Sequence, residues 1–490
     1  MEEQRANARQ SADDRNTETA EAKVKAIFMD LYNYFRMDSS MDPIVLFEQL
    51  CCVLIQLQSR TDLHSFGVIE DDPTARYYGL MEQFQLSAVG RRVTTEPFMM
   101  RDQPKLIRRL MNAADGAVEL IRDGRGLVPP LFDFLDTILQ ERRGETVGTP
   151  LQTAREIVKL VHQSDQMSLI STALDPACGS GAFLLALLEQ SEVHPTLIFS
   201  KMEGLERDEH LRNCVMLMAC FYDCFNFITI TVTDGGAPVQ IKEGAYDLIL
   251  ANPPFYTQSL RDRDILDDSH ELPVPTKDTH RAFLQRILLG LKTGGESAII
   301  VPDSFLARTD PDAIRVRRWI VEEFQCKGVV KLPAYTFYSK TPVNASVLFL
   351  RKPPAYERKF QEEGIFFFTV EVDGRSNDTR RLPVQRNDFD ELRQVWNQRD
   401  ALWREWCGEV HALNVHNMDV PVQWDHPHFW FGSLENVRRG DYSLLPEQYQ
   451  PVRPSAGPIQ DPEQILEEIQ KLGREIMELT QQLAEAEYDG

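Results

Sequence analysis

Residues 174–184 read Leu174-Asp175-Pro176-Ala177-Cys178-Gly179-Ser180-Gly181-Ala182-Phe183-Leu184, in which an apolar run leads into a glycine turn and the turn opens a helix. Glycines let the backbone approach a ligand closely, and the unpaired N–H groups at the start of a helix attract a negatively charged group. The pattern differs from the dinucleotide-binding pattern GxGxxG, because Leu184 occupies the position of the third glycine. This shorter turn favours a ligand that carries one carboxylate over a ligand that carries a pyrophosphate.

Short apolar runs alternate with helical segments on both sides of this turn, over residues 144–353. We expect strands over residues 169–174, 196–202, 227–232, 246–251, 297–301, 328–332 and 345–350. Helices are expected between them, for example over residues 208–221 and 279–291. The alternation predicts an α/β fold with a doubly wound, mainly parallel sheet. Because ligands bind beyond the carboxyl ends of the strands in such sheets, we expect the loops there to carry the chemistry.

The segments that flank residues 144–353 have different patterns. Residues 21–143 show apolar residues at helical spacing and little strand-like alternation, which predicts an all-helical N-terminal domain. Residues 1–20 are polar and are predicted to form a disordered tail. Residues 354–450 form a less regular C-terminal region, with one clear strand over residues 364–372 and one helix rich in tryptophan.

Residues 451–490 consist of a Pro/Gly-containing linker and a last helix. Asp461 can cap this helix, Pro462 suits its first position, and Gln464 completes a capping box. Its apolar residues step by four and three in turn, which is typical of a helix that packs against another helix. These residues are Ile465, Ile469, Leu472, Ile476, Leu479 and Leu483. We therefore expect a helical partner, with packing on the chain's own domain and self-association as the alternatives.

Composition limits the class of protein. The 490 residues suit two or three domains, and 42% hydrophobic with 26% charged residues is typical of globular proteins. No apolar run approaches the roughly 20 residues that span a bilayer, and residues 1–20 lack the apolar stretch of a signal peptide. We therefore expect a cytoplasmic protein without a membrane partner. The eight cysteines lack the paired spacing of zinc sites, so we expect buried thiols and no metal.

The glycine turn resembles the cofactor motif of the DNA adenine methyltransferases, in which an Asp/Asn-Pro-x-x-Gly-x-Gly turn wraps the methionine half of S-adenosyl-L-methionine. This cofactor carries one carboxylate, in agreement with the short turn. The resemblance implies a Rossmann-like S-adenosylmethionine-dependent methyltransferase domain. The turn residues then expected to contact the cofactor are Asp175, Pro176, Ala177, Gly179, Ser180 and Gly181.

Three further cofactor residues are expected outside this turn. Glu206 ends the second strand and is the natural acid for the ribose hydroxyls, with a surface acid at a helix entry as the alternative. Asp234 follows the third strand and resembles the residue that accepts from the cofactor's adenine amine, with an ordinary turn aspartate as an equal alternative. Thr153 begins a segment, residues 153–158, that resembles the family's Thr-Pro-Arg-Glu segment over the methionine end. Alanine replaces the proline here, and Thr149-Pro150 stands nearby.

The fourth expected strand ends in Asn252-Pro253-Pro254-Phe255. An exocyclic amine that attacks a sulfonium methyl group needs its lone pair localised, and the Asn252 side-chain oxygen and the Pro253 carbonyl can each accept one amine hydrogen. The two prolines stiffen the loop, and Phe255 offers a face to a base swung out of the duplex. A rigid turn with a core phenylalanine is the alternative. The motif resembles that of the DNA amino-methyltransferases, and Asn at its head implies adenine N6 as the target.

A second contact to the target base is expected from residues 331–337. This segment resembles the family's segment in which an aromatic residue contacts the base from the other side. Phe337 is the candidate and Tyr335 the reserve, while a purely structural core role is the alternative for either ring.

The order of these motifs resembles that of one subclass, which includes the modification subunits of Type I restriction–modification systems. Those subunits have an N-terminal helical domain of this size, a segment similar to residues 440–449 (here with both of its asparagines replaced), and a helical tail that packs against the specificity subunit. The resemblance implies methyl transfer from S-adenosylmethionine to N6 of a flipped-out adenine in double-stranded DNA. It also implies a specificity subunit bound through the C-terminal helix, with a second copy of the chain and a restriction subunit as further partners.

The net charge of −22 affects how such a chain would bind DNA. This charge repels phosphate, so a local basic cleft or a partner that grips the DNA is needed. A separate subunit that reads the sequence meets this need, and basic clusters such as Arg315, Arg317 and Arg318 are expected to be solvated helix charge. The alternatives are a standalone adenine methyltransferase that reads DNA with residues 354–450, a protein glutamine methyltransferase, and a degenerate scaffold.

Overall fold

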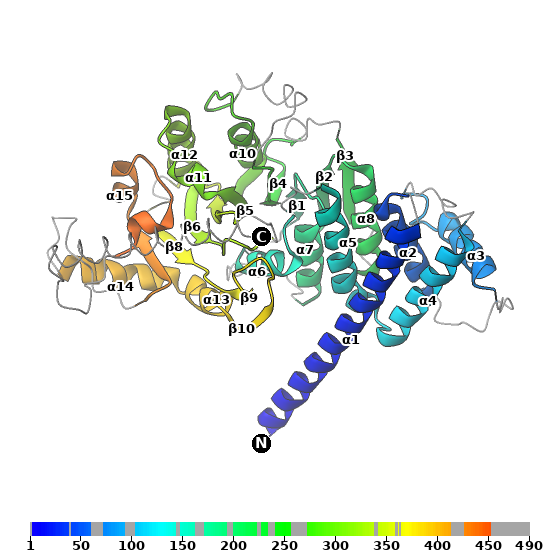
Figure 1. Cartoon of the computed structure of the whole chain (residues 1–490). Coiled ribbons are helices and arrows are strands. Elements are labelled where there is room, and N and C mark those ends of the chain that lie inside the picture. The colour runs from blue at the N-terminus through cyan, green and yellow to red at the C-terminus, as the bar shows by residue number, and fades with distance from the viewer. Residues whose placement is uncertain are drawn as a thin grey trace, which may run out of the picture.

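The computed structural model of the chain describes residues 2–38, 41–59, 72–93, 103–143, 148–161, 171–193, 199–222, 227–233, 241–255, 272–337, 342–357, 361, 364–412 and 426–451. These residues form a helical lobe and a larger α/β part, which lie side by side (Figure 1). Asp234 and the predicted C-terminal helix, within residues 452–490, lie outside the described residues.

A nine-stranded sheet forms the centre of the α/β part. Its strands, in spatial order, are β11 (Phe429–Gly432), β8 (Ile365–Thr369), β6 (Gln325–Lys331), β7 (Ala345–Arg351), β5 (Leu291–Pro302), β4 (Tyr246–Ala251), β1 (Thr172–Asp175), β2 (Lys201–Glu206) and β3 (Ile228–Val232). β3, β2, β1, β4 and β5 pair in parallel, and β8 is parallel to β6. β7 is antiparallel to β5 and β6, and β11 is antiparallel to β8. The predicted α/β fold with a doubly wound sheet is confirmed.

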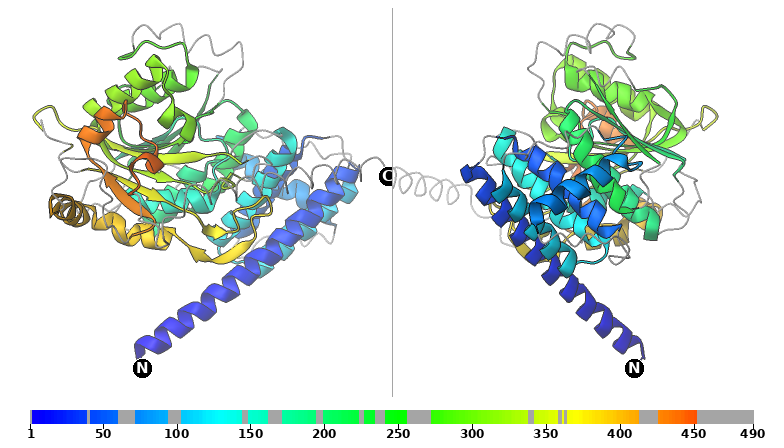
Figure 2. Two further views of the ribbon diagram at one scale, coloured as in Figure 1. Left: turned by 60° about the vertical axis from the view of Figure 1, so that its left-hand side comes forward. Right: turned by 90° about the vertical axis from the view of Figure 1, so that its right-hand side faces the viewer.

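Helices flank the sheet on both faces (Figures 1 and 2). They are α6 (Leu151–Val161), α7 (Ala182–Val193), α8 (Glu209–Ala219), α10 (Thr279–Leu289), α11 (Asp303–Ala307) and α12 (Pro311–Glu323). Because both faces are covered, nearly every side chain of β4 and β7 is buried, which explains why these strands read as continuous apolar runs.

Four strands extend past the carboxyl ends of their predicted apolar runs, among them β1 and β2. β1 continues to Asp175, which pairs with Gly204, and β2 continues to Glu206, which pairs with Val232. An apolar pattern marks which residues are buried, whereas the hydrogen-bonded ladder also includes polar residues at the strand ends. This difference matters because Asp175 and Glu206, two of the three acids predicted to serve the cofactor, are the last residues of their strands.

The N-terminal lobe is all-helical, as predicted. Its helices are α1 (Glu2–Asp38), α2 (Pro43–Gln58), α3 (Pro73–Leu86), α4 (Pro104–Leu120) and α5 (Val128–Arg143). Asp42 and Asp72 cap α2 and α3, and each is followed by a proline in the first helical position. None of the described helices is both long and apolar enough to cross a membrane.

The start of α1 differs from the prediction. A disordered tail was predicted over residues 1–20, but α1 begins at Glu2 and its N-terminal half projects from the lobe (Figure 2). The segment lacks an apolar stripe, which is why the spacing of apolar residues did not indicate a helix. Its alanine, glutamate, arginine and glutamine residues nevertheless have high intrinsic helix propensity.

A buried acid joins the lobe to the α/β part. Glu48 of α2 is only 2% exposed, and its Oε1 lies 3.0 Å from Nδ1 of His210 and accepts from Nδ2 of Asn213 at 3.2 Å. Both partners belong to α8, which packs against α2. Burial raises the pKa of Glu48 above its usual value. The lobe therefore docks on α8, next to the β3 edge of the sheet.

The C-terminal region contributes to the same sheet, through β8 and β11. The remaining elements are a hairpin of β9 (Asp373–Arg375) and β10 (Pro383–Asn387), the helices α13 (Phe389–Asn397), α14 (Arg399–Ala412) and α15 (Leu434–Arg439), and a 3-10 turn, η6 (Pro446–Tyr449). The single tryptophan-rich helix that was predicted is therefore two helices, because Gln398 ends α13.

The environment of Arg317, on α12, also differs from the prediction. It was expected to be solvated helix charge, but it is 1% exposed and donates to the carbonyl oxygens of Phe305, Asp441 and Tyr442. Asp441 and Tyr442 have φ of +54°, which aims both carbonyls at the guanidinium. Through these hydrogen bonds Arg317 links residues 440–449 to α11 and α12.

Candidate active site

The predicted site residues gather where the sheet reverses its winding order. From β1 the chain runs outward to β2 and β3, and it then returns to place β4 on the other side of β1 (Figure 1). The loops that follow adjacent strands β1 and β4 consequently diverge and leave a crevice at their carboxyl ends. The glycine turn follows β1, and Asn252 follows β4.

The two glycines of the turn have different structural roles. Both adopt positive φ, +53° at Gly179 and +82° at Gly181. A Cβ atom at Gly181 would lie 2.7 Å from Val215 of α8, whereas a Cβ atom at Gly179 would meet nothing within 4 Å. Gly181 therefore permits the close packing of α8, and Gly179 borders open space beside the turn.

Asp175 and Glu206 both contact this turn. Asp175 is 2% exposed, and its Oδ1 accepts from the backbone N–H of Ala177 at 3.1 Å. Burial raises the pKa of Asp175 to about 8. Glu206 Oε2 accepts from the N–H of Gly179 at 2.8 Å, and its Oε1 accepts from the N–H of Arg207 at 2.7 Å. The structure thus brings both predicted acids to one turn, with Asp175 largely protonated at pH 7.

Of the other predicted cofactor residues, Pro176, Ala177 and Ser180 belong to the same turn, whereas Thr153 lies on a helix that packs against α7. Pro176 is buried, Ala177 is partly buried and Ser180 is 7% exposed. Thr153 is buried on α6, which packs against α7, the helix that the turn opens. Asp234 lies outside the described residues, although the preceding Thr233 donates its N–H to the Glu206 carbonyl at 2.8 Å.

Asn252 is held by a residue that the sequence did not single out. Its Nδ2 donates to Oγ1 of Thr149 at 3.0 Å, and Thr149 is itself 8% exposed. Of the two polar atoms of this amide, Oδ1 is the one that can accept a hydrogen bond from an amine. Thr149-Pro150 was visible in the sequence only as an irregular neighbour of the Thr153 segment.

The two aromatic residues predicted to contact a base lie together. The rings of Phe255 and Phe337 are 6.2 Å apart and nearly perpendicular, at 88°. Phe255 is partly exposed and Phe337 is 4% exposed. The reserve candidate, Tyr335, has its backbone N–H bonded to Oδ1 of Asn377 at 3.3 Å. Of the two prolines between Asn252 and Phe255, Pro253 is buried and Pro254 is exposed.

His280 completes this aromatic group and was missed by sequence reasoning. It is the second residue of α10, its ring lies 6.5 Å from Phe255 and 5.7 Å from Phe305, and it is 8% exposed. Its Nε2 has no hydrogen-bond partner among the described residues. Burial lowers the pKa of His280 to about 4, so the ring is neutral at pH 7. No local pattern marks a histidine that reaches this position only through the packing of α10.

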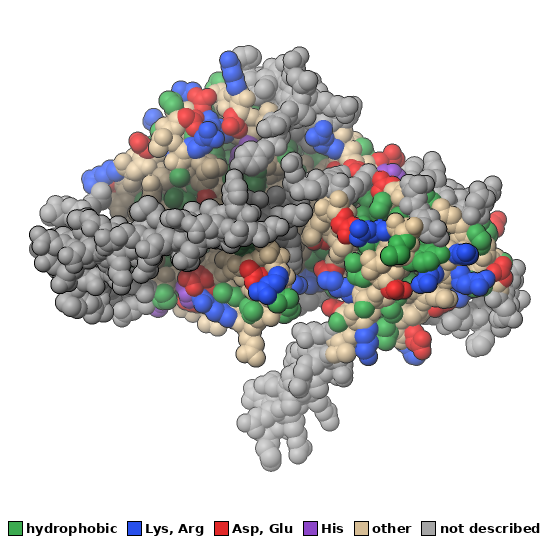
Figure 3. All heavy atoms as spheres, viewed as in Figure 1, with side chains coloured by type: hydrophobic (Ala, Val, Ile, Leu, Met, Phe, Trp, Pro, Cys, Tyr) green, Lys and Arg blue, Asp and Glu red, His purple; other side chains and the backbone are tan. Residues whose placement is uncertain are grey.

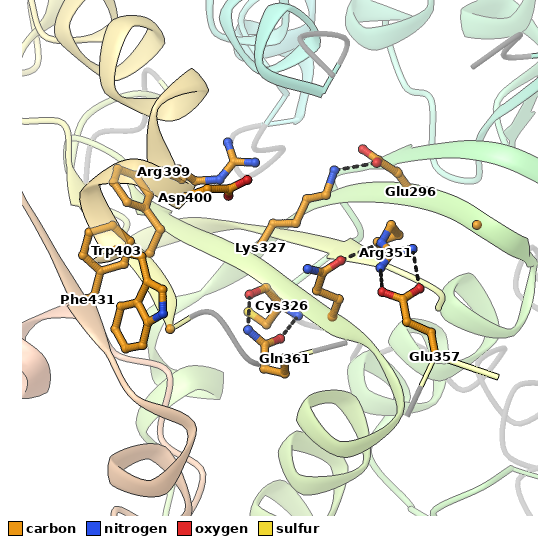
Figure 4. Close-up of a pocket in the computed structure, with 14 residues that line it drawn as sticks. Glu296, Cys326, Lys327, Arg351, Glu357, Gln361, Arg399, Asp400, Trp403 and Phe431 are labelled. Carbon is orange, nitrogen blue, oxygen red and sulfur yellow. Dashed lines mark hydrogen bonds and ion pairs between the residues drawn. The ribbon is translucent and has the colours of Figure 1, made fainter. Parts of the chain in front are cut away.

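A separate cavity of about 590 Å³ lies at the opposite end of the sheet (Figure 4). It is bordered by the amino ends of β5, β6 and β8, by the end of β7 and by α14. Two of its cations are paired there, Lys327 with Glu296 and Arg351 with Glu357. The cavity lies at the amino ends of the parallel strands β5, β6 and β8, whereas the glycine turn and Asn252 follow the carboxyl ends of β1 and β4. The cavity is therefore not part of the candidate site.

Comparison with known proteins agrees with this geometry. The sequence model described as N-6 DNA Methylase matches residues 137–455. The chain belongs to the N-6 DNA methylase family. This family member is 22% identical over 312 residues to the EcoEI methylase subunit, a Type I restriction enzyme subunit of Escherichia coli, with 59% of this chain and 60% of the relative covered.

Two further similarities extend this finding for the N-6 DNA methylase family member. It is 26% identical over 233 residues to the Type I MjaVIII methylase subunit of Methanocaldococcus jannaschii, with 44% of this chain and 38% of the relative covered. The type I restriction-modification system methyltransferase subunit from Streptococcus thermophilus has a similar fold, with a TM-score of 0.59, 14% identity, and 88% of this chain and 99% of that chain covered. The chain thus spans 60% or less of the length of these two curated relatives.

Proposed function

We propose that this chain transfers a methyl group from S-adenosyl-L-methionine to N6 of a flipped-out adenine in double-stranded DNA. The observation that carries the proposal is the Asn252 amide, oriented by Thr149 at the carboxyl end of β4. It lies one strand away from the glycine turn and three residues before Phe255, which packs against Phe337. A hydrogen-bond acceptor, a ring wall and a cofactor turn are the parts that methylation of a planar amine requires.

The residues at the glycine turn fit the cofactor. Gly179 borders open space, Glu206 is a partly exposed acid at the end of β2, and Asp175 is a buried carboxyl with a raised pKa. A buried acid of this kind suits a ligand with an ammonium group, because a neighbouring cation stabilises the carboxylate. We assign cofactor contact to these residues together with Thr153, Pro176, Ala177, Ser180, Gly181 and Asp234. When bound, S-adenosylmethionine supplies an electrophilic methyl group on its sulfonium.

The chain's own residues would prepare the target amine. Asn252 Oδ1 and the Pro253 carbonyl accept the two amine hydrogens, so that the nitrogen lone pair is localised and directed at the methyl carbon. Phe255, backed by Phe337, would form a wall against the base, and the two prolines hold the loop rigid. The nitrogen gains the methyl group, the carbon–sulfur bond breaks, and one amine proton passes to solvent.

We further propose that the chain acts as the modification subunit of a restriction–modification complex in which a separate specificity subunit reads the sequence. The net charge of −22 supports a partner that supplies most of the grip on DNA. The relatives described above are methylase subunits of Type I restriction enzymes, which favours the same arrangement. The specificity subunit would bind the helix predicted within residues 451–490, and a second copy and a restriction subunit would complete the complex.

Strand-resolved mapping of N6-methyladenine in host DNA tests this function. Wild type and Asn252→Ala are each expressed with and without the candidate specificity gene. We expect methylation at one split sequence, present only with the partner and absent from Asn252→Ala. Methylation by the wild type alone would place sequence recognition in this chain. The absence of adenine methylation in every arm, with cofactor still bound, would contradict the proposal and favour a protein substrate.

A further inference from the structure

The hairpin of β9 and β10, residues 373–387, stands apart from the main sheet as a two-stranded ribbon. Along β10, each residue from Pro383 to Arg386 is exposed, so both faces of this strand meet solvent. Leu382 and Val384 are 51% and 41% exposed, which places them among the few large apolar side chains on the described surface. A ribbon with apolar side chains in water is a feature that a binding partner would explain.

The ribbon is nonetheless built rigidly. An isolated hairpin is marginally stable, but a buried ion pair between Arg381 and Asp373, 2% and 5% exposed, ties the turn to the first strand. At its tip, Asp378 Oδ1 accepts from the N–H of Arg380 at 2.9 Å, and Ser376 Oγ accepts from the N–H of Leu382 at 2.8 Å. The exposed side chains are therefore presented on a preorganised support.

The base of the ribbon is held by a guanidinium rather than by a metal ion. Glu371, Asp388 and His428 offer ligand atoms within 4.8 Å of one another. Arg386 already lies among them and donates to Asp388 Oδ1 at 2.7 Å and to Glu371 Oε2 at 2.8 Å. Asp388 Oδ2 also accepts from the backbone N–H of Val372 at 2.9 Å. These polar contacts anchor the ribbon and are satisfied without a cation from solution.

The charge of the ribbon is opposite to that of the whole chain. Residues 373–387 contain four arginines and two aspartates, a net charge of +2, within a chain of net charge −22. Of these arginines, Arg380 is the most outward, with 73% of its side chain exposed, and it forms an ion pair with the nearby Asp378. Exposed pairs of this kind are weak and can exchange for a stronger anion. Figure 3 shows basic and hydrophobic side chains over the β9–β10 region.

The ribbon contacts the segment that leads to the proposed base site. Asn377 at its tip accepts the N–H of Tyr335 through Oδ1, at 3.3 Å. Tyr335 stands two residues before Phe337, whose ring packs against Phe255. A duplex whose adenine is turned out toward these rings would have its neighbouring nucleotides beside the ribbon.

We propose that the β9–β10 ribbon contacts the duplex next to the flipped adenine, with Arg380 on a backbone phosphate and with Leu382 and Val384 against the groove. This inference rests on the proposed function and assigns a DNA contact to this chain itself. A two-stranded ribbon has the dimensions that the major groove of DNA accepts, and a guanidinium binds phosphate in a bidentate manner. A basic ribbon would also allow a chain of net negative charge to position DNA that is bound mainly by a partner subunit.

The test compares Arg380→Gln with a matched control, Arg315→Gln. Arg315 is an exposed arginine of α12 that also pairs with a nearby aspartate, Asp312, and is 58% exposed. Each protein is purified from its host with the partners that it binds there, and its affinity for a random-sequence duplex of about 30 base pairs is measured over a range of salt concentrations. Thermal unfolding checks that both variants are folded, and Arg380→Lys tests whether a positive charge alone restores binding.

We expect Arg380→Gln to weaken duplex binding about tenfold at 0.1 M salt and to reduce the slope of log affinity against log salt by about 1, because one phosphate contact is lost. Arg380→Lys and Arg315→Gln should retain the wild-type slope. If the wild type binds duplex and methylates it, but Arg380→Gln has the wild-type slope of log affinity against log salt, the ribbon contact is overturned. The proposed function would then still stand. Loss of a copurifying subunit in Arg380→Gln would also overturn the ribbon contact, because the ribbon would then bind protein. No duplex binding by the wild type would contradict both proposals.

Discussion

At the residue scale, the proposed chemistry depends on how one amide is oriented. The side chain of asparagine presents a donor on one side and an acceptor on the other, and only the acceptor can help an amine to act as a nucleophile. In this chain Nδ2 of Asn252 donates a hydrogen bond to Oγ1 of Thr149, with 3.0 Å between the two atoms. In the proposed mechanism Thr149 is thus a positioning residue, which acts through Asn252 and need not touch the base.

Replacing Thr149 tests this role. We expect Thr149→Val to lower kcat for methyl transfer about 10- to 100-fold, because the Asn252 amide is no longer held in one orientation. KM for DNA and the cofactor Kd should change little, and Thr149→Ser, which keeps the hydroxyl, should restore the rate. Single-turnover methylation with the three proteins is the measurement. A Thr149→Ser rate as low as that of Thr149→Val would mean that packing rather than the hydroxyl matters.

If Asp175 binds the cofactor as proposed, cofactor binding should be sensitive to pH. Its pKa is raised to about 8 by burial, so the carboxyl is mostly protonated at pH 7 in the free protein. A bound ammonium group favours the ionised form, so binding at pH 7 should release close to one proton. Below pH 8 the affinity should rise with pH by up to about tenfold per unit and then level off, because each unit of pKa corresponds to about 1.4 kcal/mol.

Calorimetry in two buffers of different ionisation enthalpy measures this proton release directly. Asp175→Asn keeps an acceptor for the Ala177 N–H but cannot ionise, and it serves as the control. We expect its binding to show no such slope between about pH 5.5 and 7.5. Equal slopes in wild type and Asp175→Asn would assign the proton to another group.

At the scale of elements, the glycine turn between β1 and α7 combines a packing requirement with the proposed binding of the cofactor. A side chain at Gly181 would collide with Val215 of α8, whereas a side chain at Gly179 would point into open space. Two residues that look equivalent in the sequence are therefore separable by mutation.

We expect Gly181→Ala to lower the free energy of unfolding by about 2 kcal/mol or more, because it adds a collision to the strain at φ of +82°. Gly179→Ala should cost only about 1 kcal/mol, from its positive φ, but should weaken cofactor binding more than tenfold by filling the space beside the turn. Urea unfolding and equilibrium dialysis with labelled cofactor separate the two effects. The assignment fails if Gly179→Ala binds cofactor as tightly as the wild type.

At the scale of the whole molecule, distant segments assemble the candidate site and its surroundings. Residues 148–161 supply Thr149 and α6, residues 171–255 supply the turn and the Asn252 loop, and residues 272–337 supply His280 and Phe337. The C-terminal region adds two strands to the sheet and sets the β9–β10 ribbon beside Tyr335. The N-terminal lobe joins through buried Glu48, on the far side of β3.

The sequence alone determined the fold class and the chemical motifs of this protein. The glycine turn and the Asn-Pro-Pro-Phe loop are short contiguous patterns whose residue types carry their own chemistry, and each follows an apolar strand. The alternation of strands and helices placed both at the same edge of a sheet. Glu206 could likewise be predicted, because it ends the strand that follows the turn.

The tertiary structure decided which residues support that chemistry. Thr149 and Asn252 are 103 positions apart, and Asn377 and Tyr335 are 42 apart, so no periodicity relates the members of either pair. His280 and Arg317 resemble ordinary helix residues in the sequence, yet packing buries one beside Phe255 and the other under residues 440–449. Local patterns encode which faces are apolar and which turns form, whereas contacts between distant side chains exist only once the elements have packed together.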